Sequence, residues 1–268
     1  MIGAMSRALA CLAVIVVLVA AQACGRSTPS APPIPIPPPA ATAAPVDADP
    51  HIGAVFLGAT ALHTCAAAVL HSKTGDLIVT AAHCLADGYD ITFVPGFVGA
   101  GGPAGTWTVH AVYLDQRWLA ARDPVADYAI ARVGRDGAGS IEALAGPGLV
   151  LGRAPNAGTA VTITAYPLGS GGGPIGCRGS TAVASGGFPS MRCAGFDDGT
   201  SGGPWRNGST LVGLIGGLHG GGCPDENVSY SPPFDDGVAQ LLARAEAGGP
   251  ADTAPESFDD HCVRPGTG

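Results

Sequence analysis

Residues 77–84 read LIVTAAHC, and this stretch does most to decide the fold. Its first half is a run of aliphatic and β-branched residues, which favour strands. Two alanines then separate the strand from His83, and such small residues leave room for the imidazole ring at the edge of a β-lobe. The cysteine that follows can cross-link that edge. We therefore expect a buried strand that presents a histidine at its end.

Two further segments carry reactive side chains. Residues 199–204 read GTSGGP, and the glycines around Ser201 permit sharp turns and close approach of another chain. Residues 127–133 read DYAIARV, so Asp127 heads an apolar strand. A carboxylate in that position becomes partly buried and needs a hydrogen-bonded partner. Taken singly, these patterns also fit a glycine-rich hairpin and a capped turn.

A serine, a histidine and an aspartate together supply what acyl transfer needs. Serine is a weak nucleophile until a neighbouring base takes its proton, and histidine has a pKa suited to that exchange. A buried aspartate can hold the histidine in the correct tautomer. Ser201, His83 and Asp127 are therefore the candidate nucleophile, base and orienting group.

As a set, the three segments resemble those of the chymotrypsin-like (trypsin-family) serine peptidases, where they occur in the order His, Asp, Ser. Thr80–Cys84 matches the family's T-A-A-H-C motif, and Gly199–Pro204 matches G-x-S-G-G-P. Asp127–Ile130 matches the strand that begins with the family's aspartate. The resemblance covers residues 51 to about 247.

The resemblance implies an all-β fold of two six-stranded antiparallel β-barrel lobes, with the active site between them and a C-terminal helix. It implies a secreted endopeptidase whose catalytic residues are His83, Asp127 and Ser201, acting on polypeptides without a cofactor. The backbone N–H groups of Gly199 and Ser201 would form the oxyanion hole. We expect no metal site, because the sequence has neither a CxxC pair nor an HExxH helix.

The cysteines fit an exported protein. The chain has eight, of which Cys11 lies in the N-terminal apolar run and Cys24 follows it. The other six allow three disulfides. The family has a disulfide that maps onto Cys65–Cys84, and we pair the remainder as Cys177–Cys193 and Cys223–Cys262.

Three departures from the family pattern concern activation and specificity. Thr200 stands where digestive members have an aspartate that pairs with a new N-terminus, and no basic cleavage site precedes Ile52. We therefore expect an oxyanion hole that forms without N-terminal processing. Gly195 occupies the position that often sets specificity, which does not support cleavage after basic residues.

The expected substrate-binding strand is the third departure. Gly216 replaces a serine common in the family, although its backbone and that of Gly217 can still pair with an extended substrate. His219 follows closely and is either a pocket residue or an exposed loop histidine. These two glycines, with Gly195 and His219, complete the predicted substrate-binding set.

The organisation of the chain agrees with an all-β domain. Glycine and proline, 42 and 24 residues, separate short runs typical of strands. These runs are Ala54–Thr60, Cys65–Leu70, Leu77–Ala82, Ile91–Val94, Trp107–Leu114, Tyr128–Val133, Ala160–Tyr166, Ala182–Ala184 and Leu211–Ile215. One helix is expected after Asp235 and Asp236, where Val238, Leu241, Leu242 and Ala245 recur at helical spacing.

The ends of the chain carry targeting and spacer signals. Residues 1–24 are predicted to be a signal peptide, and two outcomes stay open: lipidation at Cys24, which would anchor the protein to a bacterial membrane, or a free or removed Cys24. Residues 25–50 form a Pro/Ala-rich linker. The peptidase domain then spans 51–248, and residues 249–268 form a tail that carries Cys262.

Composition excludes one class of partner and leaves rival functions to weigh. The net charge is −8, so no basic stripe is available for binding nucleic acid. For the oligomeric state, a monomer is the default expectation. An α/β-hydrolase would use Ser201 with Asp225 or Asp236 and His261, but only 67 residues follow the serine and no strand–helix alternation surrounds it. The other alternative is a catalytically inactive secreted binding module on the same fold.

Overall fold

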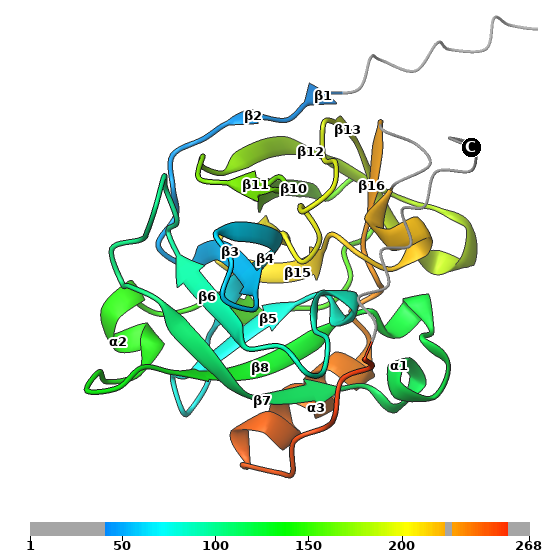
Figure 1. The fold of residues 1–268 in the computed structure, drawn as a ribbon. Coiled ribbons are helices and arrows are strands. Elements are labelled where there is room, and N and C mark those ends of the chain that lie inside the picture. The colour runs from blue at the N-terminus through cyan, green and yellow to red at the C-terminus, as the bar shows by residue number, and fades with distance from the viewer. Residues whose placement is uncertain (1–40, 223–226, 257–268) are drawn as a thin grey trace, which may run out of the picture. The chain divides into compact units, whose positions relative to one another are not determined.

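The computed structural model of the protein describes residues 41–222 and 227–256 (Figure 1). Their strands form two sheets, one of seven and one of nine strands. The helices are few and short apart from one at the C-terminal end of the domain. This is the chymotrypsin-like architecture expected from the sequence.

The first sheet contains a closed six-stranded antiparallel barrel. Strand β4 pairs with both β3 and β5, so the order β4-β3-β6-β7-β8-β5 returns to its start. Closure leaves no free edge on these six strands. Their bounds are β3 (Ile52–Leu57), β4 (Leu62–Leu70), β5 (Leu77–Thr80), β6 (Ile91–Pro95), β7 (Trp107–Leu114) and β8 (Ala129–Gly134). The two-residue strand β11 (Gly169–Ser170) extends this sheet beside the start of β4.

Six longer strands form the second lobe, in the order β16-β13-β12-β10-β14-β15. Its two outer strands are not joined by a ladder. Instead, the Gly216 N–H after β15 donates to the Tyr230 carbonyl in β16, at 3.1 Å. The strands are β10 (Ala160–Ala165), β12 (Ile175–Val183), β13 (Pro189–Ala194), β14 (Pro204–Asn207), β15 (Thr210–Leu214) and β16 (Val228–Tyr230). The short strand β9 (Val150–Leu151) adds to β15 in parallel.

Residues 41–50 lie on the second lobe, although their composition predicts a linker. Strand β1 (Ala41–Thr42) pairs with β13, and β2 (Ala44–Pro45) pairs with β12. Asp49 then binds Arg206 of β14 through an ion pair of 2.7 Å. The described part of the second lobe therefore includes residues 41–50, ahead of residue 51, where the sequence predicted the domain to start. The predicted signal peptide and residues 25–40 of the predicted linker lie outside the described residues.

The helix expected near the C-terminus is present as α3 (Asp236–Glu246). The side chain of Asp235 caps it by accepting from the Gly237 N–H, and its buried residues are Val238, Leu241 and Ala245. Two shorter helices were not predicted, α1 (Gln116–Ala121) and α2 (Ile141–Ala145). Across the described residues, no helix has the length and apolar character needed to cross a membrane.

Two of the three predicted disulfides are confirmed. Cys65–Cys84 links β4 to the residue after His83, and Cys177–Cys193 links β12 to β13. The third predicted pair, Cys223–Cys262, lies outside the described residues.

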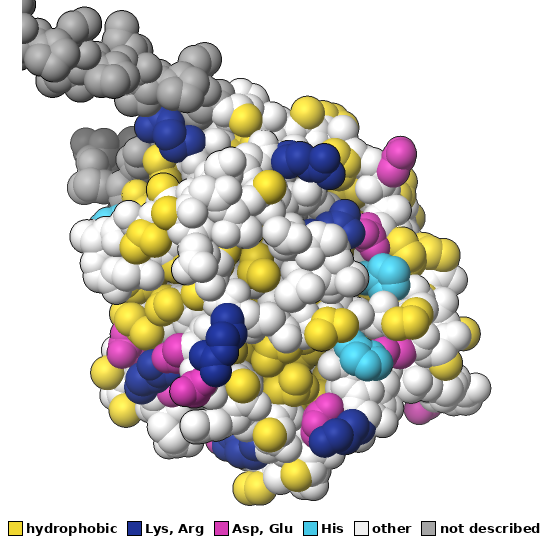
Figure 2. All heavy atoms as spheres, turned by 180° about the vertical axis from the view of Figure 1, so that it is seen from behind, with side chains coloured by type: hydrophobic (Ala, Val, Ile, Leu, Met, Phe, Trp, Pro, Cys, Tyr) yellow, Lys and Arg dark blue, Asp and Glu magenta, His cyan; other side chains and the backbone are white. Residues whose placement is uncertain are grey.

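Charged side chains are interspersed by sign on the face that Figure 2 shows, where Lys and Arg lie beside Asp and Glu. Among the described residues, Lys73 pairs with Glu246, and Arg206 with Asp49. Neighbouring charges of opposite sign cancel at a distance, so this face presents no extended basic surface.

Candidate active site

His83 lies where strand β5 leaves the barrel. The chain turns after Thr80 into a short 3₁₀ segment, η1 (Ala82–Cys84), and the histidine is 7% exposed. Two bonds fix this turn: the Cys65–Cys84 disulfide, and a hydrogen bond of 2.7 Å from the Thr80 hydroxyl to the Ala66 carbonyl. The sequence expectation of a histidine at a cross-linked strand end is therefore met.

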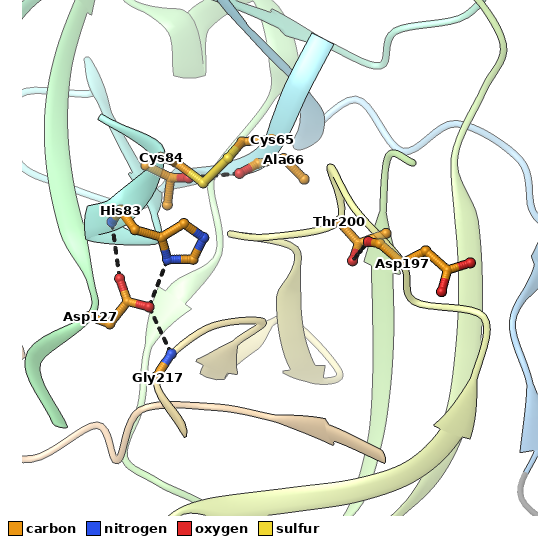
Figure 3. The surroundings of a disulfide bond; sticks show 9 residues. Cys65, Ala66, His83, Cys84, Asp127, Asp197, Thr200 and Gly217 are labelled. Atoms are coloured by element: carbon orange, nitrogen blue, oxygen red, sulfur yellow. Dashed lines mark hydrogen bonds and ion pairs between the residues drawn. A yellow bond between two sulfur atoms is a disulfide. The ribbon is translucent and has the colours of Figure 1, made fainter. Parts of the chain in front are cut away.

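Asp127 faces His83 across the barrel end and is 1% exposed. It follows the 3₁₀ turn η2 (Pro124–Ala126) and precedes β8. One carboxylate oxygen, Oδ1, accepts from the His83 backbone N–H at 3.0 Å. The other, Oδ2, lies 2.8 Å from His83 Nδ1 and accepts from the Gly217 N–H at 2.7 Å. Figure 3 shows the carboxylate between these two residues.

The hydrogen bonds decide the charge of Asp127 and the tautomer of His83. Burial would raise the pKa of Asp127, but the charge of His83 and the hydrogen bonds from His83 and Gly217 hold that pKa below its usual value. An ionised carboxylate only accepts hydrogen bonds, so the proton on the neutral ring must sit on Nδ1. Nε2 is then the basic nitrogen of His83.

Ser201 sits on a turn that is held against the middle of β4 in the first barrel and against the residue that follows β15 in the second lobe. Its carbonyl accepts from the Ala66 N–H of β4 at 2.8 Å, and the next residue, Gly202, donates to the Ile215 carbonyl at 2.8 Å. A Cβ on Gly202 would lie 2.1 Å from the Ala66 carbonyl oxygen and 3.1 Å from the Ala81 nitrogen. Only glycine permits this approach, which brings the serine's turn beside the segment that carries His83.

Two backbone donors lie in the turn that carries Ser201. Gly199 has a φ of +83°, and a Cβ there would lie 2.1 Å from the Leu168 nitrogen. Within the described residues, neither the Gly199 N–H nor the Ser201 N–H donates a hydrogen bond to another part of the chain. Thr200 between them is buried, and its hydroxyl donates to the Asp197 carbonyl at 2.6 Å. This bond fixes the turn locally, at the position where the family's digestive members have an aspartate.

The four predicted substrate-binding residues separate into different environments. Gly216 and Gly217 are buried beside Asp127, and a Cβ on Gly216 would lie 2.9 Å from Asp127 Oδ2. His219 is exposed, with its ring against Tyr230 at 6.2 Å between centroids. Gly195 has a φ of +86°, and a Cβ added to it would lie 3.7 Å from the Cβ of Ala43 in the N-terminal segment.

Gly217 has a role that sequence reasoning missed. The sequence predicted Gly217 only as a substrate-binding residue, next to a Gly216 that lacks the serine common in the family. The third hydrogen bond to the carboxylate comes instead from the backbone of the next residue, whose φ of +77° and ψ of −119° require glycine. The sequence signal for it was the Gly216-Gly217 pair itself.

A second missed feature anchors the strand that follows Asp127. The buried Tyr128 hydroxyl donates to Asp115 at 2.8 Å and accepts from Arg117 at 2.7 Å, and Arg117 also binds Asp235 at 2.8 Å. Burial acts to raise the pKa of Asp115, but hydrogen bonds from Arg117 and Tyr128 lower it to about 2. The network joins α1, β8 and α3 one residue from Asp127.

The side chains near His83 do not form a metal site. The sulfurs of Cys65 and Cys84 lie within 4.8 Å of one ring nitrogen of His83, which is close enough for shared ligation. Both sulfurs are bonded to each other. Metal binding by cysteine requires the thiolate, so this cluster offers only the imidazole.

The comparisons with known proteins identify the domain. A family model described as a trypsin-like peptidase domain matches residues 66–214, more than half of the chain. The protease Anisep from Arthrobacter nicotinovorans has a similar structure, with a TM-score of 0.65 at 21% identity over 75% of this chain and 98% of its own. The thermostable serine protease AL20 from an extremophilic microorganism gives 0.65 at 24%, over 74% and 98%.

A third similar structure is that of a Glu endopeptidase, with a TM-score of 0.61 at 15% identity over 80% of this chain and 100% of its own. No curated protein matches the chain. At these identities the solved structures show a shared fold, and the activity has to be argued from the residues of the site.

Proposed function

Because the chain belongs to the trypsin-like peptidase family, we propose that it is a serine endopeptidase that works through the residues His83, Asp127 and Ser201. The observation that carries the proposal is the buried pair of His83 Nδ1 and Asp127 Oδ2, 2.8 Å apart, beside the turn of Ser201. A carboxylate buried at such a distance fixes a histidine in the tautomer that general-base catalysis needs.

In this mechanism Ser201 Oγ attacks the carbonyl carbon of a peptide bond while His83 Nε2 takes the hydroxyl proton. The tetrahedral intermediate collapses when His83 gives that proton to the leaving amine, which departs and leaves an ester on Ser201. Water then attacks the ester with His83 again as base, so the acid product leaves and the serine is regenerated. Asp127 stabilises the imidazolium in both steps.

The N–H groups of Gly199 and Ser201 would stabilise the oxyanion in this mechanism. Neither donates to an acceptor within the described chain, which keeps both available. Such a donor contributes roughly 10²–10³ in rate. The Thr200 bond to Asp197 holds the turn without help from a free N-terminus, in support of an oxyanion hole that forms without processing.

The test is hydrolysis of a diverse library of internally quenched peptides by residues 25–268, exported into an oxidising compartment. The matched control is Ser201→Ala, which removes one oxygen from a turn held by backbone bonds. We expect turnover to fall roughly 10⁴-fold or more. Absence of turnover by both folded proteins would refute the peptidase and favour the binding module.

We also propose that the protein is exported and anchored through a lipid on Cys24. Disulfides such as Cys65–Cys84 and Cys177–Cys193 persist in oxidising compartments, which supports export. Anchoring predicts that the full chain made in a bacterial host enters the detergent phase, and that Cys24→Ser releases it to the aqueous phase. Equal partitioning of the two proteins would contradict the anchor.

A further inference from the structure

A pocket of about 310 Å³ opens at one end of the first barrel. Phe56, Val94 and Phe97, all at least nine-tenths buried, form its apolar part, and exposed residues such as Ala100 also line it. The uncharged polar part of the lining comes from Thr60, Thr92 and Thr106. None of its lining residues is charged. This volume is at the lower end of the range for ligand-binding pockets, which starts at about 300 Å³. A pocket with these walls disfavours a charged group, because burial would strip the charge of water.

Exposed apolar side chains lie on the segments around this pocket. Leu62, Val98 and Leu168 are 42%, 56% and 48% exposed, and they are three of the eight large hydrophobic residues exposed among the described residues. Their segments are joined to one another. Leu62 pairs with Ser170 in the ladder between β4 and β11, and Gly99 donates to the Gly172 carbonyl at 2.7 Å. Exposed apolar surface gathered in this way is typical of a binding surface.

The same segments reach the turn that carries Ser201. The Leu168 N–H donates to the Asp198 carbonyl at 2.7 Å, and Gly199 lies directly against Leu168. Strand β4 makes the second connection, because Ala66 binds the Ser201 carbonyl and Leu62 lies four residues earlier along the strand. Four residues of strand span about 13 Å. The pocket therefore lies a few substrate residues away from the candidate nucleophile.

The direction of the substrate follows from the two flanks of Ser201. On one flank Gly202 binds Ile215, which follows β15 and leads to Gly216 and Gly217, the residues predicted to pair with an extended substrate. The proposed mechanism assigns this flank to the acyl half of the substrate. On the other flank lie β4 and β11, which lead to the pocket. An extended chain that passes Ser201 sends its leaving-group half along this second flank.

We propose that this pocket binds a large apolar side chain of the polypeptide substrate, about three or four residues beyond the bond that is cleaved. The inference rests on the proposed function and adds to it a substrate class, namely polypeptides with an aromatic or aliphatic residue in the leaving half. Binding so far from the reacting bond contributes to the selection of long substrates over short ones.

The experiment uses internally quenched peptides with one acyl half, chosen from the library, and with phenylalanine or aspartate placed in turn at each of five positions after the cleaved bond. A short ester with the same acyl half has no leaving-group residues. Ala100→Trp fills the pocket from an exposed position. Ala157→Trp, at an exposed position that does not line the pocket, is the matched control.

We expect phenylalanine to raise kcat/KM about tenfold or more over aspartate at the third or fourth position, a ratio within reach of one apolar pocket. Ala100→Trp should abolish that preference and leave ester hydrolysis unchanged, and Ala157→Trp should alter neither. Ester turnover with no positional preference, or a preference that survives Ala100→Trp, would overturn the pocket assignment alone. No turnover of the ester by the unaltered protein would instead defeat the proposed function, and the inference with it.

Discussion

Gly217→Ala tests whether the backbone of this residue positions Asp127. The Gly217 N–H lies 2.7 Å from Asp127 Oδ2, and its backbone has a φ of +77°. An added Cβ would lie 2.9 Å from the Pro232 nitrogen and 3.0 Å from the Pro124 carbonyl oxygen. The turn has to shift, and the hydrogen bond to the carboxylate is lost or lengthened.

The magnitude follows from that one bond. A hydrogen bond to a charged group contributes about 1.5–3 kcal/mol. About 1.4 kcal/mol corresponds to a factor of ten in rate. Because part of the bond's energy also stabilises the resting enzyme, we expect kcat/KM to fall about ten- to a hundredfold, with most of the loss in kcat.

The pH profile separates positioning from general damage. The Gly217 bond helps to hold the pKa of Asp127 down, so its loss raises that pKa. A carboxylate with one donor fewer also attracts the imidazolium more strongly, which favours the protonated ring of His83. The active form needs neutral His83, so the acid limb of kcat/KM moves to higher pH.

Gly208→Ala is the matched control for this variant. Gly208 also has a positive φ, +61°, but a Cβ there would meet no atom within 4 Å. It carries the same kind of backbone strain without a link to Asp127. Equal losses of activity in the two variants, or a Gly217→Ala protein with an unshifted acid limb, would refute the positioning role.

Three further predictions concern stability. Replacing Cys65 and Cys84 by alanine should lower the free energy of unfolding by about 2–5 kcal/mol, as measured by urea titration, and a loss below 1 kcal/mol would contradict this. A chain that begins at Ile52 should melt at a lower temperature than one that begins at Ala41, because it lacks β1, β2 and Asp49, which bind β13, β12 and Arg206. Equal melting temperatures would show that these contacts are dispensable. The pKa of Asp115 is about 2 in the folded chain and near 3.8 in the unfolded chain, so its ionised carboxylate stabilises the fold above pH 3.8, and this effect is lost as the pH falls toward 2. Asp115→Asn should therefore flatten the dependence of the unfolding free energy on pH in that range, and an unchanged slope would contradict the assignment.

The sequence predicted the first barrel well because its strands are continuous runs of strand-forming residues. Leu77–Thr80 and Trp107–Leu114 lie within the predicted ranges, and α3 begins at the acidic pair Asp235 and Asp236, as predicted. Strand β13 was missed because it begins with Pro189 and includes a charged residue, Arg192, so it lacks an apolar run. Strand β14 was missed because it starts at the last residue of the serine motif.

The N-terminal strands show a different limit. Ala41–Pro45 is rich in alanine and proline, and the residues of its two short strands are exposed, so its composition resembles that of a spacer. It becomes strand only because β12 and β13 offer free hydrogen-bonding groups. Pairing of this kind depends on a partner far away in the sequence and leaves no local pattern.

In the candidate site, too, some groups could be predicted from the sequence and others could not. The candidate catalytic side chains of His83 and Asp127 stand in recognisable motifs, and the structure places these two in hydrogen-bond contact. Ser201 remains a prediction that rests on its motif and on its turn. The Gly217 N–H has no side chain to identify it, so its contribution emerged only from the geometry.

Covalent labelling of the unaltered protein with a fluorophosphonate probe, located by mass spectrometry of its peptides, tests the central claim most directly. Such a probe forms a stable phosphonyl ester only with a serine that a neighbouring base activates. We predict one labelled residue, Ser201, with labelling lost in His83→Ala and slowed in Asp127→Asn. Absence of label from Ser201 in the folded protein, or labelling that His83→Ala leaves unchanged, would contradict the proposed mechanism.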